Sequence, residues 1–372
     1  MSYPRPPFMD PNTKTTTNTT GFFAATPVTA PVFDTPISRR ENFFRAARRD
    51  NPLWVPVAYT DIQLLQANEQ ADEKPGNPGH QLGPRFKHPA SENYNFYDPF
   101  GNSWTWEASA GGAMLTPGTK VVDDICNWEK CIKFPNFDDW NFKEVAAKYM
   151  KETYDPEKVM HINIYQGLTE MLIAFLGGYG EGMMALAEEP EACKDFFWRF
   201  SQHLIDFFDY MCELYPIDYV TWHDDYGTER DTFFSEKMMA ELVFEPTKKL
   251  TDHIKSKGKI LELHSCGKIE RFLPYIIDMG VDLIWLQPRA NDMVKMKAMY
   301  GDKIGFNFPL DGMVPGVTYT EDEIIKCVRE SVDKYAKNGG FLPLIRGNDQ
   351  HEVWTIATEL YAYSREFYEN LK

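Results

Sequence analysis

The sequence predicts an α/β fold of the (β/α)₈ TIM-barrel type with an extended N-terminal arm. Short apolar runs typical of strands alternate with amphipathic runs typical of helices over most of the 372 residues. A helix between two strands returns the chain to the same edge of the sheet, so such strands are parallel. About seven or eight strands can be counted, and eight close a barrel. A doubly wound open sheet is the alternative, although no Gly-x-Gly-x-x-Gly opens a helix after a strand.

The arm is predicted to span residues 1–37 and the barrel residues 38–372. Residues 1–36 are rich in Thr, Pro and Asn and have little helical pattern. We expect this segment to lie across the barrel or across a second subunit, which would make the protein a homodimer. The barrel begins at Ser38-Arg39-Arg40-Glu41, a capping box that precedes an amphipathic run.

The barrel elements follow in order along the chain. A strand is expected at 54–59, and residues 68–101 are irregular and aromatic, as is typical of a lid or binding loop. The later strands are expected at 161–165, 219–222, 259–264, 282–286, 303–308 and 340–345. The later helices are expected at 139–152, 189–214, 235–257, 268–279, 320–338 and 351–371.

Composition excludes several classes of protein. A net charge of −16 argues against nucleic-acid binding and against binding to an anionic membrane surface. No run approaches the roughly 18 apolar residues of a membrane helix, and the first residues lack the apolar core of a signal peptide, so a cytoplasmic location is expected. The six cysteines are scattered and are expected to be reduced thiols.

Polar residues follow the predicted strands, where the active site of a TIM barrel lies. A purely structural strand end would not need so many ionisable groups. The predicted substrate-binding residues are Tyr59, Asp61, Gln166, Tyr226, Arg346 and Asn348.

The pattern His264-x-Cys266-Gly267 is the sharpest chemical signal. Because side chains alternate along a strand, His264 and Cys266 point to the same side, and an imidazole and a thiolate at this spacing can hold one zinc ion. Gly267 allows a tight turn into the next helix. The structural alternative is a satisfied histidine beside an inert thiol. Placement at a strand end favours the metal site.

Asp224 and Asp225 form the second signal. Adjacent carboxylates repel each other unless a cation, an arginine or a shared proton compensates. Both are predicted to be catalytic, as a substrate anchor, a general acid or a metal ligand. The structural alternative has Asp224 capping a helix and Asp225 pairing with Arg230. After the last strand, Asn348 or Asp349 is also a candidate helix cap.

Three segments resemble the uroporphyrinogen decarboxylase superfamily, and most of all its zinc-dependent corrinoid methyltransferase branch. That branch includes coenzyme M methyltransferases and bacterial O-demethylases. The similarity runs from about Ser38 to the C-terminus. The segments are Asp98-Pro99-Phe100-Gly101-Asn102-Ser103-Trp104-Thr105-Trp106-Glu107, Asp224-Asp225-Tyr226-Gly227 and Leu263-His264-Ser265-Cys266-Gly267-Lys268-Ile269.

Two departures refine what the resemblance implies. Decarboxylases carry arginines near the first strand, but residues 54–61 contain none, which disfavours that activity. Many zinc-using relatives supply a third thiolate after the last strand, whereas residues 344–349 contain no cysteine. We therefore expect a harder third ligand, Asp349 by preference, with His351, Asp225 and Glu229 as alternatives.

The resemblance implies transfer of a methyl group from a small donor to the cobalt of a corrinoid held by a partner protein. A methyl ether such as a methoxylated aromatic is the preferred donor, with methanol or a methylamine next. Zinc would stabilise the departing oxygen, and Asp225 would donate a proton. The alternatives are a metal-free lyase of the same superfamily, a ligand-binding barrel without catalysis, and the reverse transfer to a thiol or folate.

Overall fold

The computed structural model describes residues 14–18, 28–65, 92–109, 112–314, 317–345 and 349–371, with side chains from residue 29 onward. The chain divides into two compact units. Unit 1 comprises residues 1–64, 155–161 and 282–372, and unit 2 comprises residues 65–154 and 162–281. The division into these two units does not test the predicted boundary between the arm and the barrel at residue 37, which stays a prediction.

Seven strands belong to one sheet in the order β12-β11-β10-β9-β8-β7-β3. The pairs β8/β9, β10/β11 and β11/β12 are parallel. Helices alternate with the strands along the chain, so the structure confirms the predicted fold class, a TIM-barrel type of α/β fold. The strands are β3 (Ile62–Leu65), β7 (Val159–Ile164), β8 (Tyr219–His223), β9 (Ile260–His264), β10 (Leu283–Trp285), β11 (Gly305–Pro309) and β12 (Phe341–Leu344).

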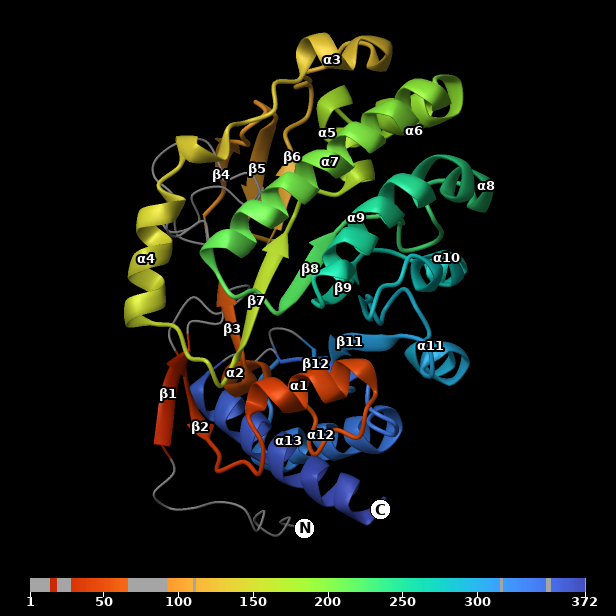
Figure 1. Ribbon diagram of the computed structural model, residues 1–372. Helices are drawn as coiled ribbons and strands as arrows, with labels where there is room; N and C mark the ends of the chain where they lie inside the picture. Colours follow the sequence, from red (N-terminus) through yellow and green to blue (C-terminus); the bar gives the residue numbers. More distant parts are fainter. Residues whose placement is uncertain are drawn as a thin grey trace. The chain divides into compact units, whose positions relative to one another are not determined.

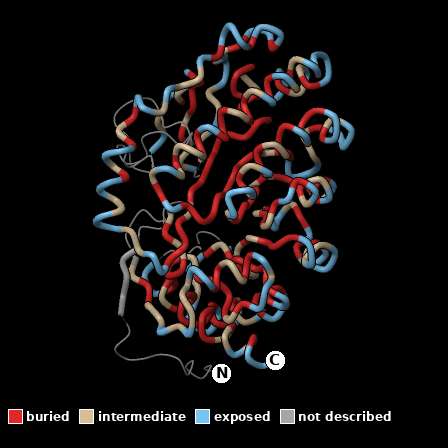
Figure 2. Tube along the Cα trace, viewed as in Figure 1, coloured by how far each residue is buried: buried red, intermediate tan, exposed pale blue. Residues whose placement is uncertain are grey.

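Unit 2 packs long helices beside its strands. The helix α7 (Pro190–Leu214) contacts α9 (Phe244–Ser256), which in turn contacts β9 (Figure 1). Every residue of β8 is buried, and so is every residue of β9 except His264; Figure 2 shows this central part of the unit mainly as buried tube. A separate antiparallel sheet is formed by β4 (Tyr94–Tyr97), β5 (Ser103–Glu107) and β6 (Gly112–Leu115). The α-helices are α3 (Trp128–Cys131), α4 (Phe142–Glu152), α5 (Leu168–Leu176), α6 (Tyr179–Glu188), α7 (Pro190–Leu214), α8 (Glu236–Met238), α9 (Phe244–Ser256) and α10 (Leu273–Asp278).

Unit 1 contains the described part of the N-terminal arm, which is extended, as predicted. The strands β1 (Lys14–Asn18) and β2 (Val28–Val32) pair antiparallel, and β2 contacts α13. The ring of Phe33 stacks on Tyr361 at 4.1 Å, which fixes the arm to the last helix. Contact of the arm with a second copy stays a prediction. The helices of unit 1 are α1 (Arg39–Arg48), α2 (Ala58–Asp61), α11 (Met293–Tyr300), α12 (Glu321–Tyr335) and α13 (Gln350–Asn370).

The strand predicted at 54–59 is wrong. These residues form an irregular stretch and the start of α2, and the first strand of the sheet, β3, begins at Ile62. Side chains take the backbone groups that a ladder would need, since Asn42 donates to the Trp54 carbonyl and Asp61 accepts from the Val57 N–H. Pro56 has no N–H to offer. Tyr59 and Asp61 therefore precede a strand and do not follow one.

Candidate metal centre

The strands β7, β8 and β9 carry polar side chains on one face and apolar side chains on the other. Asn163, His223 and His264 occupy equivalent alternate positions, and β8 and β9 pair with His223 opposite His264. The intervening positions hold Ile162, Trp222 and Leu263, all of which are buried. The polar face continues past the strand ends to Asp225 and Cys266. Alternation alone thus gathers the reactive groups of unit 2 on one side.

Asp225, His264 and Cys266 form a cluster in which one ligand atom from each residue lies within 4.8 Å of the others. The Cys266 Sγ is 3.5 Å from the His264 Nε2, and this nitrogen is 4.0 Å from the Asp225 Oδ1. The side chains of His264 and Asp225 are 13% and 27% exposed, so the cluster is accessible but largely dry. Among the described residues, it is the one group of this kind.

The loops after β8 and β9 are tied together around this cluster. The Cys266 N–H donates to the Asp225 Oδ1 at 2.7 Å, and the Tyr226 N–H donates to the Ser265 Oγ at 2.9 Å. Gly267 has φ +84°, and a Cβ there would lie 2.1 Å from the Gly227 carbonyl oxygen. Only glycine permits this close approach, so the prediction that Gly267 makes a tight turn is confirmed.

Asp224 points away from the cluster and binds the N-terminus of α5. Its carboxylate accepts hydrogen bonds from the N–H groups of Leu168, Thr169 and Glu170 at 3.0–3.1 Å and from the Thr169 hydroxyl. A fully buried carboxylate needs such donors, and the helix dipole adds favourable interaction. Burial nevertheless raises the pKa of Asp224 to about 7. This geometry gives Asp224 a positioning role, capping a helix 55 residues before it in sequence.

His223 is a site residue that the sequence prediction did not single out. Its ring lies 4.9 Å from the His264 ring and 4.1 Å from the Tyr165 ring, measured between centroids. Its Nε2 is 3.3 Å from the Asn163 Oδ1. The only available signal was its position two residues before Asp225, on the same face of the strand.

Gln166 and Tyr226, both predicted to bind substrate, are completely buried in unit 2. The Gln166 carbonyl accepts from the Trp222 indole, while its side-chain amide has no hydrogen-bond partner among the described residues. The Tyr226 ring packs edge-on against Phe234 and Phe272, which makes it part of the core. Whether either residue contacts a substrate stays a prediction.

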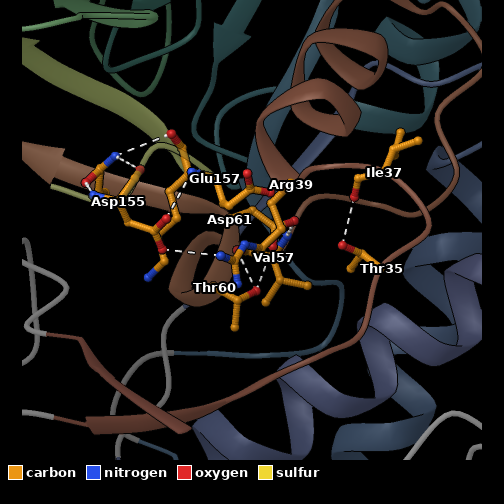
Figure 3. Close-up of polar contacts among 10 residues, drawn as sticks. Thr35, Ile37, Arg39, Val57, Thr60, Asp61, Asp155 and Glu157 are labelled. Atoms are coloured by element: carbon orange, nitrogen blue, oxygen red, sulfur yellow. Dashed lines mark hydrogen bonds and ion pairs between the residues drawn. The ribbon is translucent and has the colours of Figure 1, made fainter. Parts of the chain in front are cut away.

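Tyr59, Asp61 and Asp349 lie in unit 1. The Asp61 carboxylate accepts from the Val57 N–H and the Thr60 hydroxyl (Figure 3). It also accepts from the Trp54 indole, and burial raises the pKa of this carboxyl. The Tyr59 hydroxyl donates to the Ile345 carbonyl at 3.3 Å.

The Asp349 carboxylate accepts from the Glu352 N–H at 2.9 Å and caps α13. This hydrogen bond is the helix cap that the sequence offered as an alternative. The role of Asp349 as a metal ligand stays a prediction. Arg346 and Asn348 lie outside the described residues.

The donor set of the cluster fits a transition-metal ion. Structural and catalytic zinc sites are built from imidazole nitrogen, thiolate and carboxylate oxygen, and catalytic sites keep a position open for substrate. Three protein ligands from two adjacent strand ends match this pattern. The sequence prediction preferred Asp349 as the third ligand and gave Asp225 as an alternative, whereas the structure groups Asp225 with His264 and Cys266.

A family model that matches the middle of the chain agrees with the predicted superfamily. The family model described as uroporphyrinogen decarboxylase matches residues 170–342, just under half of the chain. A methyltransferase from Methanosarcina mazei has the same fold, with a TM-score of 0.58 and 13% identity over 89% of this chain and 99% of that one. No curated protein matches.

A sugar phosphate isomerase/epimerase from Parabacteroides distasonis is also similar, at 11% identity over 59% of this chain and 78% of that one. Its TM-score of 0.28 is too low to support an argument. Among the described residues, no helix of the chain is long and apolar enough to cross a membrane.

Proposed function

We propose that this protein is a zinc-dependent methyltransferase of the uroporphyrinogen decarboxylase superfamily, whose family model matches residues 170–342. It transfers a methyl group that is bound to oxygen in the donor, by preference a methyl ether, to the cobalt of a corrinoid held by a partner protein. The single observation that supports this best is the cluster of Asp225, His264 and Cys266 at the ends of adjacent strands. The fold of the methyltransferase from M. mazei is compatible with the proposal.

The proposed ligands differ in their tasks. His264 and Cys266 leave the same face of β9 and supply a nitrogen and a sulfur donor, while Asp225 supplies an oxygen donor and holds the Cys266 backbone. Zinc would act as a Lewis acid toward the oxygen of the donor. An oxygen ligand in place of a third thiolate leaves more positive charge on the metal. Such a metal favours a substrate that binds through oxygen over a substrate that binds through a thiol.

Elemental analysis of the purified protein tests the metal. We expect about one zinc per chain in the natural protein and in Cys131→Ala, which removes an exposed thiol elsewhere in unit 2, and loss of zinc in Cys266→Ala. The pair Asp225→Asn and Asp349→Asn separates the two candidate third ligands. Asparagine caps a helix as well as aspartate does, so Asp349→Asn should fold and keep its zinc, whereas Asp225→Asn should bind zinc more weakly.

Metal retained in Cys266→Ala, or absent from the natural protein after zinc is supplied, would remove the basis of the proposal. A metal-free lyase is the second candidate, because the matching family is described as a decarboxylase. It predicts turnover that chelators do not affect and that requires no corrinoid. A cytoplasmic location, expected from the sequence, is included in the proposal because it would keep the Cys266 thiol reduced.

A further inference from the structure

The His264 side chain has to keep one orientation if the cluster is to bind a metal ion. Its Nε2 lies 3.5 Å from the Cys266 Sγ and 4.0 Å from the Asp225 Oδ1. The last torsion of a histidine side chain is broad, so an imidazole keeps such a direction only if its neighbours restrict it. Asp225 and Cys266 are joined to each other through the Cys266 N–H, which leaves the orientation of the His264 ring to be explained.

The ring of His223 packs against the His264 imidazole. The two residues are partners in the parallel register of β8 and β9, and their side chains leave the same face of the sheet. Their ring centroids lie 4.9 Å apart, with 52° between the ring planes, so the two imidazoles are in direct contact. A rotation of the His264 ring would therefore have to displace His223.

His223 is itself held from the side of β7, the strand on the other edge of β8. Its Nε2 lies 3.3 Å from the Asn163 Oδ1, and because an amide oxygen only accepts, the Nε2 carries the hydrogen of this bond. The Tyr165 ring stacks on His223 at a centroid distance of 4.1 Å. All three of these residues are buried, so the His223 ring has little room to move.

His223 is distinct from the proposed ligands. Among the described residues, the potential ligand atoms that lie within 4.8 Å of one another belong to Asp225, His264 and Cys266. The Nε2 of His223 is directed to Asn163 instead, on the β7 side. An effect of His223 on the metal would therefore pass through the His264 ring.

We propose that His223 is a positioning residue that holds the His264 imidazole in its metal-binding orientation, along a line of contacts from Asn163 to His223 and from His223 to His264. This inference rests on the proposed function for the presence of a metal at the cluster. The His223 ring restricts His264, and the bond to Asn163 anchors the His223 ring. Because His264 is already ordered, less conformational freedom is lost when the ion binds.

Titration of the metal-free protein with Co²⁺ alone tests this role without turnover. The Cys266 thiolate gives a charge-transfer band when it binds Co²⁺, and the d–d bands report the geometry of the ligands. In His223→Ala, which removes the ring, we expect Co²⁺ to bind about tenfold more weakly, with altered d–d bands. His223→Phe keeps a ring and should lose only about threefold, with the natural bands. Phe207→Ala is the control, because it removes a buried ring from α7 in the same unit and should bind Co²⁺ as the natural protein does.

A second set of variants tests the anchor. Asn163→Ala removes the acceptor of the His223 Nε2–H and should weaken Co²⁺ binding about threefold. The same change in the His223→Phe background should have no further effect, because phenylalanine has no N–H to donate. Losses that simply add would show that Asn163 acts independently of His223 and would overturn the line of contacts. These variants keep a ring beside His264, so they decide the question even if His223→Ala fails to fold.

The outcomes separate this inference from the proposed function. Natural Co²⁺ binding by folded His223→Ala overturns the positioning role, even if the natural protein transfers methyl groups. Complete loss of binding in His223→Phe, as expected for Cys266→Ala, also overturns it, because His223 would then be a ligand. If the expected pattern of Co²⁺ binding appears but no methyl transfer is found, the positioning role stands and the proposed function fails. Absence of Co²⁺ binding by the natural protein overturns both.

Discussion

His203 provides the clearest test of the packing of unit 2. Its imidazole is 2% exposed, and its Nε2 has no hydrogen-bond partner among the described residues. The rings of Phe100, Phe134, Phe137 and Phe200 surround it at centroid distances of 5.1–5.5 Å. Burial, assisted by the nearby charge of Arg199, lowers the pKa of His203 to about 3. The aromatic rings around His203 thus favour the neutral imidazole over the protonated one.

The expected effect on stability follows from the two pKa values. In the unfolded chain, His203 binds a proton with a pKa of about 6.5, whereas in the folded protein it stays neutral at this pH. The free energy of unfolding therefore falls as the pH drops below this value. For a folded pKa of about 3, the loss between about pH 7.5 and pH 5 is about 2 kcal/mol. Above about pH 7 His203 costs the folded state almost no stability, and below about pH 7 the free energy of unfolding falls steadily because the unfolded chain binds the proton.

Replacement of His203 by leucine, which has a similar volume and no charge, isolates this contribution. Urea unfolding of the natural protein and of His203→Leu is measured at several pH values, and their free energies of unfolding are subtracted. Other groups with shifted pKa values, such as His161 and Asp224, contribute to both proteins and cancel. The difference should grow by about 2 kcal/mol in favour of the variant toward pH 5.

Curves for the natural protein and His203→Leu that stay parallel over the whole pH range would refute the reasoning, because the imidazole would then accept a proton equally well in both states.

Two further predictions concern the walls of the candidate metal centre. Asp224→Asn replaces a buried carboxyl that accepts several hydrogen bonds at the N-terminus of α5, so it leaves donors unsatisfied and should cost about 2–4 kcal/mol in urea unfolding. Asp231→Asn, at an exposed aspartate of the same loop, should cost less than about 1 kcal/mol. Gly267→Ala combines a φ of +84° with a backbone clash, so it should lose zinc and destabilise unit 2 by several kcal/mol. Gly258→Ala has a similar φ of +75° but open space around its Cβ, and should cost only about 1–2 kcal/mol and keep the metal.

Local patterns allowed the fold class and half of the candidate site to be predicted. Alternation along a strand placed His264 and Cys266 on one side because their relation spans only two residues. The strand at 54–59 was wrong because apolar content could not reveal that Asn42 and Asp61 capture the backbone groups of Trp54 and Val57. Such competition depends on individual side-chain hydrogen bonds, which the apolar content of a segment does not report.

The remaining site residues gave no local signal. His223 ends β8 and His264 ends β9, so their proximity depends on how the strands are ordered in the sheet. The choice of Asp225 from four candidate third ligands likewise needed the register of β8 against β9.

The two adjacent carboxylates of Asp224 and Asp225 show how one strand serves both the fold and the site. Successive side chains leave a strand on opposite faces, so the two charges separate instead of facing each other. The Asp224 side chain points toward the start of α5, where three N–H groups and a hydroxyl donate hydrogen bonds to it. The Asp225 side chain points toward His264 and Cys266. The same step holds the N-terminus of α5, and α5 in turn contacts α6. Loss of Asp224 should therefore disturb the packing of α5 and α6 as well as the loop that carries Asp225.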